Sequence, residues 1–257
     1  MWYASILVFV FCLSLFGLRV YKAYRLPIHL RWEIFPIPNS SLPTMGKEIL
    51  FFSTLFRQRR YLWPFSLSLH LGIYLLVVSL LILSSGLLAT RFGLCQKDCL
   101  SGAVSFSSSA GHIFGFCGSS VLLCLRLFHP DLRPFSSNSK YLSLSLLACL
   151  FGTGLYGYLS TDLYGAYRSY MEYLFGMREG LELAIQGYIH LIATLVFIVW
   201  LPLSDMVHFV AKYFTYHRIR WDRKSIDTSM ERRLRRLRSQ RISWASLEEA
   251  RPRWSDL

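Results

Sequence analysis

Charged residues are scarce in this sequence, and acidic ones are the scarcest: 257 residues include 28 Lys and Arg but only 15 Asp and Glu, whereas 53% are hydrophobic. A soluble chain of this length could hardly bury so much apolar surface. The apolar runs also lack the alternating polarity of barrel strands. Helices satisfy their own backbone hydrogen bonds in lipid, so uninterrupted runs of about 17–25 residues predict membrane helices.

Five such runs are present, at roughly residues 4–20, 63–88, 108–127, 142–159 and 183–203. They predict an all-α membrane protein whose five transmembrane helices form one bundle. No internal repeat and no long disordered domain is visible. We therefore divide the chain into a membrane domain, residues 1–210, and a basic tail, residues 211–257.

Basic residues are distributed unequally between the two ends of these runs. Of the 28 Lys and Arg, 24 lie in the segments that follow the first, third and fifth runs. Because cytoplasmic loops carry the excess of Lys and Arg, this distribution predicts an N-terminus outside and a C-terminus in the cytoplasm. The first run lacks a basic start, so we expect it to remain as an anchor instead of being cleaved as a signal peptide.

Four histidines lie within or at the ends of the apolar runs. His190 and His208 are 18 residues apart, so they share one helix face and are separated by about 27 Å along its axis. Ionisable residues in membrane helices are rare and usually functional, and imidazole is a common haem ligand. The predicted topology puts His70 at the cytoplasmic depth of His208, and His112 at the outer depth of His190. Two pairs at two depths predict two bis-histidine b-type haems.

Glycines form a small face beside His112, at Gly111, Gly115 and Gly118. Such a face leaves room for a flat macrocycle. It is equally typical of close packing between membrane helices. The sequence leaves both interpretations open.

Polar residues near each membrane surface are candidates for contacts with cofactors. At the cytoplasmic surface, candidates for the haem propionates are Arg57, Arg60 and Arg126. Arginine forms charge-assisted forks with carboxylates, although these residues could also serve only to set the topology. At the outer surface, candidates for a quinone site are Arg91, Lys97, Glu182 and Gln186. Solvation of the loops would explain these four residues as well.

Cysteines are few and form no iron–sulfur motif. Cys95 and Cys99 share the outer loop with a spacing of four, which suits a disulfide in an oxidising compartment or half of a metal site. The other four lie in apolar runs and are expected to act as small apolar residues. Any iron–sulfur cluster must therefore belong to a partner.

Three segments resemble the gamma subunit of respiratory nitrate reductase, a five-helix di-haem cytochrome b. They are the segment HLGIY that begins at His70, the stretch LCLRLFHPDLRP at the end of the third run, and the region from His190 through Pro202 to His208. The resemblance covers about residues 63–216. It implies two haem b groups and a membrane quinone as substrate.

One position departs from that family. Its nitrate reductase members carry a second histidine ten residues after the one that matches His70, and this chain has Leu80 there. We therefore expect His112 to supply the missing outer ligand. This departure, with the segment PIHLRWE at residues 27–33, makes the chain more similar to relatives that accompany iron–sulfur proteins of the heterodisulfide reductase type in dissimilatory sulfur metabolism. Such relatives imply a bacterial or archaeal cytoplasmic membrane, a cytoplasmic iron–sulfur partner, and other membrane or outer-side redox subunits.

These observations together predict the membrane-anchoring di-haem subunit of a respiratory oxidoreductase complex, exchanging electrons between a quinol such as menaquinol and the iron–sulfur partner. Two other classes stay open. A haem-free anchor would leave four aligned histidines without a role, and a histidine-lined proton or metal transporter should carry more intramembrane Asp or Glu. The basic tail is a candidate for partner docking or for binding anionic lipid. Nothing in it indicates readout of nucleic acid.

Overall fold

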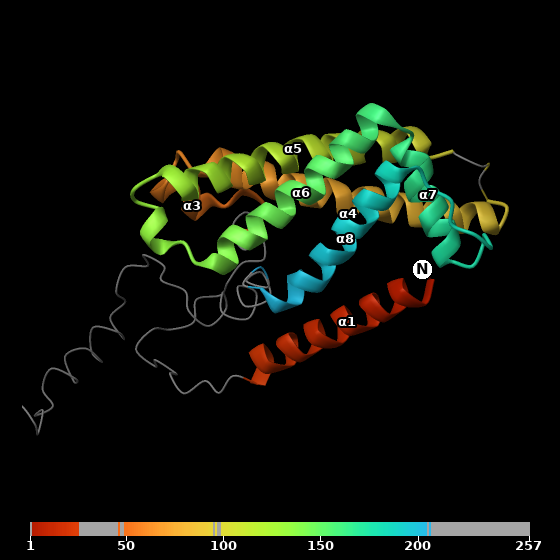
Figure 1. Ribbon diagram of the computed structural model, residues 1–257, viewed down its shortest axis with the longest axis horizontal. Coiled ribbons are helices and arrows are strands. Elements are labelled where there is room, and N and C mark those ends of the chain that lie inside the picture. The colour runs from red at the N-terminus through yellow and green to blue at the C-terminus, as the bar shows by residue number, and fades with distance from the viewer. Residues whose placement is uncertain are drawn as a thin grey trace, which may run out of the picture.

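The computed structural model describes residues 2–25, 46, 49–94, 96, 99–204 and 206, and within them all regular structure is helical. In chain order the elements are α1 (Trp2–Arg25), α3 (Ser53–Gln58), α4 (Trp63–Arg91), α5 (Ser101–Phe128), the 3-10 turn η1 (Arg133–Phe135), α6 (Asn138–Ser160), α7 (Leu163–Leu174) and α8 (Ile185–Leu203) (Figure 1). The prediction of an all-α protein is confirmed for this part of the chain.

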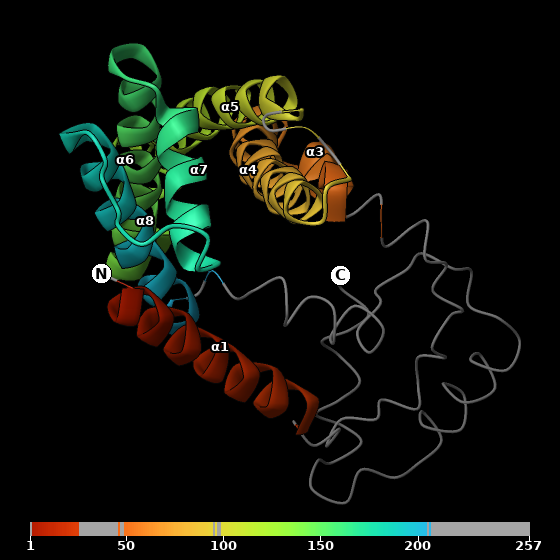
Figure 2. The same cartoon turned by 90° about the vertical axis from the view of Figure 1, so that its right-hand side faces the viewer.

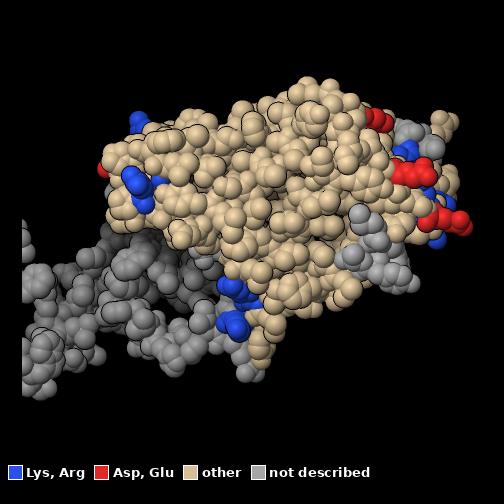
Figure 3. Space-filling view, in the orientation of Figure 1, with Lys and Arg blue, Asp and Glu red and all other residues tan. Residues whose placement is uncertain are grey.

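Five of these helices, α1, α4, α5, α6 and α8, are long and apolar enough to cross a membrane. Figure 3 shows the charged side chains of the visible face near the ends of the helices, with a wide uncharged surface between them. Large apolar side chains lie exposed on the helices, such as Leu81 at 63% and Phe106 at 75%. Such exposure suits contact with lipid. The prediction of five transmembrane helices is therefore confirmed.

The five long helices form a curved row. α4 packs against α5, α5 against α6, α6 against α8, and α8 against α1. In the view of Figure 2 this row traces an arc, and α7 lies between α6 and α4. The short helix α7 contacts α4, α5 and α6, so it covers the inner side of the arc at one end.

The two ends of the bundle differ in what they carry. The end that we call the α7 end holds α7, the carboxyl ends of α4 and α6, and the amino ends of α1, α5 and α8 (Figure 1). The opposite end, called the α3 end, holds α3 and η1. A tight connection joins α6 to α7, where the Asp162 carboxylate accepts a hydrogen bond from the Gly165 backbone N–H at 3.0 Å. This N-cap begins α7 directly after α6 ends.

Glycines determine how closely α4 and α5 approach. A Cβ atom on Gly72 would lie 2.5 Å from the backbone nitrogen of Gly115, and a Cβ atom on Gly118 would overlap with the backbone of Leu69. Gly111 faces the backbone of Gly72 in the same contact. The glycine face beside His112 therefore serves helix packing, and the alternative that it makes room for a macrocycle is not needed to explain it.

Replacing Gly72 by Ala should destabilise the bundle, because the added methyl group meets backbone that has no side-chain freedom to move aside. Overpacking of this kind costs about 1–3 kcal/mol, so we expect the unfolding temperature in detergent to fall by about 2–10 °C. Gly102→Ala is the matched control, since nothing lies within 4 Å of its added Cβ. Equal unfolding temperatures for the two variants would contradict this account of the α4–α5 contact.

Candidate functional site

Two buried histidines from helices far apart in the sequence meet at the α7 end of the bundle. The ring of His112 on α5 and the ring of His190 on α8 have centroids 5.3 Å apart and an interplanar angle of 64°. Their exposed fractions are 0% and 5%. The structure thus brings together the two histidines that the sequence assigns to the outer depth.

Hydrogen bonds assign the proton positions on the His112 ring. Its Nδ1 atom lies 2.6 Å from the carbonyl oxygen of Ser108, one helical turn earlier. A carbonyl oxygen only accepts, so Nδ1 carries the proton and donates. Nε2 of His112 is then left with a lone pair.

The His190 ring also contacts an oxygen through Nδ1. Its Nδ1 atom lies 3.1 Å from Oγ1 of Thr153 on α6. The Thr153 hydroxyl can donate either to this nitrogen or to the Leu150 carbonyl at 3.0 Å, so the contact fits both neutral tautomers of His190.

Nε2 of each ring lies beside one atom, the hydroxyl oxygen of Tyr167 on α7. That oxygen lies 3.1 Å from Nε2 of His112 and 2.8 Å from Nε2 of His190. Burial raises the pKa of the Tyr167 hydroxyl well above its ordinary value, so the phenol keeps its proton at neutral pH. The hydroxyl donates to Nε2 of His112 and can accept from Nε2–H of His190. All three rings are hydrogen-bonded in this arrangement when Thr153 donates to Nδ1 of His190.

The space for the His112 ring comes from a glycine on α6. A Cβ atom on Gly154 would overlap with the imidazole of His112. The side chains of Phe151 and Tyr158 flank the same ring, with centroids 6.2 and 5.8 Å away. Tyr158 also forms a hydrogen bond with the hydroxyl of Ser108. The imidazole is thus held from several sides.

This donor set has the chemistry of a metal-ligand pair. Histidines that bind a metal through Nε2 usually donate Nδ1–H to a carbonyl or another oxygen, which fixes the tautomer and the ring orientation. His112 has that pattern, and Nε2 of His112 and Nε2 of His190 approach one point, which the Tyr167 hydroxyl occupies. An iron held by both rings would have to take the place of that hydroxyl.

The predicted cytoplasmic pair is described only in part. His70 on α4 donates from Nδ1 to the Ser66 carbonyl at 2.7 Å, one turn earlier, as His112 does with Ser108. Its ring lies 4.4 Å from the ring of Phe52, centroid to centroid. His208 lies outside the described residues, so the pairing of His70 with His208 stays a prediction.

The three arginines predicted to contact haem propionates lie at the α3 end. Arg57 and Arg60 are exposed, and the guanidinium of Arg60 lies 5.5 Å from the ring centroid of Phe56. Arg126 is half-buried and donates to the Ser136 hydroxyl at 3.2 Å. A role in propionate binding stays a prediction for all three.

The predicted quinone residues are spread over the α7 end. Arg91 and Glu182 are exposed, Gln186 is half-buried, and Lys97 lies outside the described residues. Among the described residues, no hydrogen bond or ion pair joins Arg91, Glu182 and Gln186, and a quinone site there stays a prediction. The cysteine Cys99 in the α4–α5 connection is disulfide-bonded.

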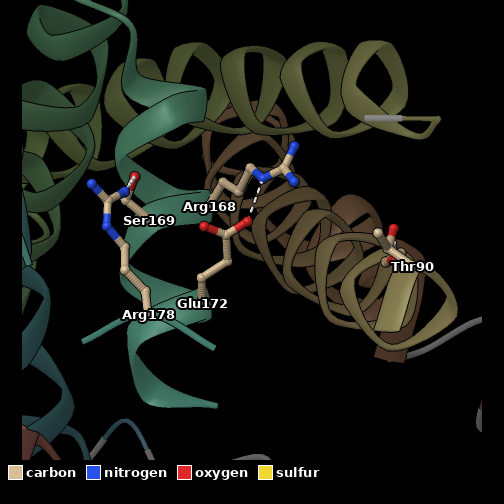
Figure 4. A network of polar contacts seen from close by, with 6 residues as sticks. Thr90, Arg168, Ser169, Glu172 and Arg178 are labelled. Carbon is tan, nitrogen blue, oxygen red and sulfur yellow. Dashed lines mark hydrogen bonds and ion pairs between the residues drawn. The ribbon is translucent and has the colours of Figure 1, made fainter. Parts of the chain in front are cut away.

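Sequence reasoning missed the polar residues of α7. Arg168 and Glu172 form an ion pair of 2.7 Å between Nε and Oε1, and their side chains are only 11% and 20% exposed. Figure 4 shows this pair beside the contact of Arg178 with the Ser169 hydroxyl, which measures 3.0 Å. The spacing of four between Arg168 and Glu172 is typical of a helical pair, and it was the available signal for α7.

Comparison with known proteins adds no identification. No protein-family model matches this chain, and no curated protein matches it significantly.

Replacing Gly154 by Ala should displace the His112 ring, because its Cβ would occupy the position of that imidazole. We expect a loss of about 1–3 kcal/mol in the free energy of unfolding, measured by denaturation in detergent. Gly152→Ala on the same helix is the control, since its Cβ would lie 3.1 Å from the mobile ring edge of Phe116. A Gly154→Ala variant as stable as Gly152→Ala would argue against this packing of His112.

Proposed function

We propose that this chain is the haem-binding, electron-carrying membrane subunit of a quinol-linked oxidoreductase. The observation that carries the proposal is the convergence of Nε2 of His112 and Nε2 of His190, each with its Nδ1 already engaged. The resemblance to di-haem cytochromes b supports the same assignment.

His112 and His190 serve as the axial ligands of the outer haem. A bound haem supplies one-electron redox chemistry. The Ser108 carbonyl holds the His112 imidazole in the tautomer that ligation requires, and the Thr153 hydroxyl orients the His190 ring. Burial of both rings keeps water away from the site. Ligand orientation and burial are two of the means by which a protein sets a haem potential.

A second haem at the cytoplasmic side is ligated by His70 and His208. The hydrogen bond from Nδ1 of His70 to the Ser66 carbonyl orients the imidazole, as the Ser108 carbonyl does for His112. His208 follows His190 by 18 residues, but α8 ends at Leu203 and Ser204 is extended. The prediction that one continuous helix carries both histidines is therefore wrong. Two haems at these depths would connect the two membrane surfaces for electron transfer.

The orientation that we propose puts the α7 end outside and the α3 end in the cytoplasm. Basic residues at the α3 end support it, because Arg57, Arg59, Arg60 and Arg133 all lie there and are exposed. The disulfide-bonded Cys99 at the α7 end also supports it, since disulfides persist in oxidising compartments. The basic tail would then face the cytoplasmic partner and anionic lipid.

The substrate and partners follow from this orientation and from the family resemblance. A menaquinol-type quinol reacts beside the outer haem, near Arg91, Lys97, Glu182 and Gln186. Electrons pass inward to an iron–sulfur protein of the heterodisulfide reductase type. The complex belongs to a bacterial or archaeal cytoplasmic membrane and includes further redox subunits.

Replacement of single histidines should remove one haem at a time. His112→Ala and His190→Ala should each lower the haem content from two to one and abolish the same spectral component. His70→Ala and His208→Ala should each remove the other component. His129→Ala is the control, because its ring stacks on Tyr61 at 5.4 Å and has no predicted ligand role. Reduced-minus-oxidised visible spectra and extracted haem per chain measure the outcome. Two haems retained in the His190→Ala variant would contradict the assignment of His190 as a haem ligand.

Thiol labelling tests the proposed orientation. After reduction with an impermeant reductant, an impermeant maleimide should label Cys99 in intact spheroplasts. A Ser137→Cys variant introduces a thiol at the α3 end, because Ser137 is exposed at the start of α6. This thiol should react only after permeabilisation. The reverse pattern would invert the topology and put the His112–His190 pair on the cytoplasmic side.

A further inference from the structure

The α3 end of the bundle is strongly basic. Its basic side chains, which come from α3 and the turn after it, α5, η1 and α6, include Arg57, Arg59, Arg60, Arg126, Arg133 and Lys140. Among the residues that the structure describes, Asp131 is the one acidic side chain at this end. Most of the acidic side chains visible in Figure 3 lie at the α7 end instead. The excess of positive charge attracts anions to the α3 end.

Aromatic side chains mark the depth of the membrane surface at this end. Tyr61 and Trp63 lie where α4 begins, and the ring of Trp63 lies 5.0 Å from the ring of Phe56, centroid to centroid. The Trp63 indole N–H donates to the Phe51 carbonyl at 2.7 Å. Tyrosine and tryptophan are enriched where the hydrocarbon core meets the lipid headgroups. The headgroups at the α3 end are therefore level with the start of α4.

A shallow apolar groove runs along α5 near the same end. Its volume is about 490 Å³, and the described residues that line it include Val121, Cys124, Phe128 and His129. The first three are spaced by three and four residues, so they share one face of α5. Phe128 is 80% exposed. An exposed apolar groove on a membrane helix suits a hydrocarbon chain.

Three hydrogen-bond donors lie at the polar end of this groove. Nδ1 of His129 accepts from the Asp131 backbone N–H at 3.3 Å, so the neutral ring carries its proton on Nε2. The His129 ring stacks on the Tyr61 ring, with centroids 5.4 Å apart and an interplanar angle of 15°. Nη1 of Arg59 lies 3.5 Å from the Tyr61 hydroxyl oxygen. The Asp131 carboxylate lies on the Nδ1 side of the His129 ring, 4.0 Å away.

We propose that this flank of α5 binds an anionic phospholipid. One acyl chain lies in the groove along Val121, Cys124 and Phe128, and the phosphodiester lies at Arg59, Tyr61 and His129. Arginine forms charge-assisted hydrogen bonds with phosphate oxygens, and an anionic headgroup adds no positive charge to a surface that already has an excess of it.

A lipid suits this groove better than a protein partner does. The groove lies on the last turns of a helix that is long and apolar enough to cross a membrane, where lipid is the surrounding solvent. The site is at the opposite end of the bundle from His112 and His190, so it does not depend on the proposed haem binding.

The reactivity of two cysteines tests the site in the unaltered protein. Cys124 lines the groove, whereas Cys149 on α6 is also exposed and does not line it. The full-length protein in nonionic detergent is treated with a lipid-soluble maleimide at increasing mole fractions of phosphatidylglycerol, and peptide mass spectrometry gives the labelling rate of each cysteine. We expect phosphatidylglycerol to slow the labelling of Cys124 and to leave that of Cys149 unchanged.

Two further ligands distinguish an anionic lipid from other phosphate compounds. Phosphatidylcholine with the same acyl chains should need a higher mole fraction to protect Cys124, and inorganic phosphate should give no protection. Equal labelling of Cys124 with and without phosphatidylglycerol would overturn the proposal. Equal protection by phosphatidylcholine, or protection by inorganic phosphate alone, would also overturn it.

A matched pair of variants tests the headgroup contacts. Arg59→Gln should raise the mole fraction of phosphatidylglycerol that half-protects Cys124 about fivefold, the effect of one basic residue near anionic lipid. Arg60→Gln removes the same charge from the next residue, whose guanidinium lies over the Phe56 ring at 5.5 Å, and should behave like the wild-type chain. Both side chains are exposed, so the unfolding temperatures in detergent should stay equal. An equal shift in both variants would show general charge attraction and contradict a defined site.

Discussion

The contact between two neutral imidazoles and one phenol organises the α7 end of this protein. A polar group buried in a membrane bundle costs free energy unless it is hydrogen-bonded. Each Nδ1 atom is satisfied by a fixed oxygen, from Ser108 on α5 and from Thr153 on α6. Both Nε2 atoms depend on Tyr167. Four helices, α5, α6, α7 and α8, therefore meet where these three rings meet.

Close packing on both sides of this contact depends on glycine. Gly154 leaves room for the His112 ring, and Gly72 and Gly118 let α4 approach α5 until their backbones touch. α4, α5 and α6 are therefore closely packed, and large apolar side chains remain exposed along the row of helices. The long helices with the short helix α7 across one end would form the frame for the haem that we propose.

Length and hydropathy sufficed to predict five helices, because each long apolar run has few alternatives in lipid. They did not predict that α5 begins at Ser101, since its first turns are rich in small polar residues such as Ser107, whose hydroxyl is satisfied by the Ala103 carbonyl. They missed α7, which is short and carries the ion pair of Arg168 and Glu172. The similar depths expected for His112 and His190 in the membrane correctly predicted that their rings lie close together. The role of Tyr167 could not be predicted, because it depends on how α7 folds back over helices that are distant in sequence.

We propose Nε2 of His112 and Nε2 of His190 as the ligands of a haem iron at the α7 end. The most direct test is the visible spectrum of the full-length protein, purified from membranes of cells with ample haem, combined with extraction of its haem. The account predicts reduced b-type bands and two haems per chain. A well-folded protein that carries no haem and shows no such bands would contradict it.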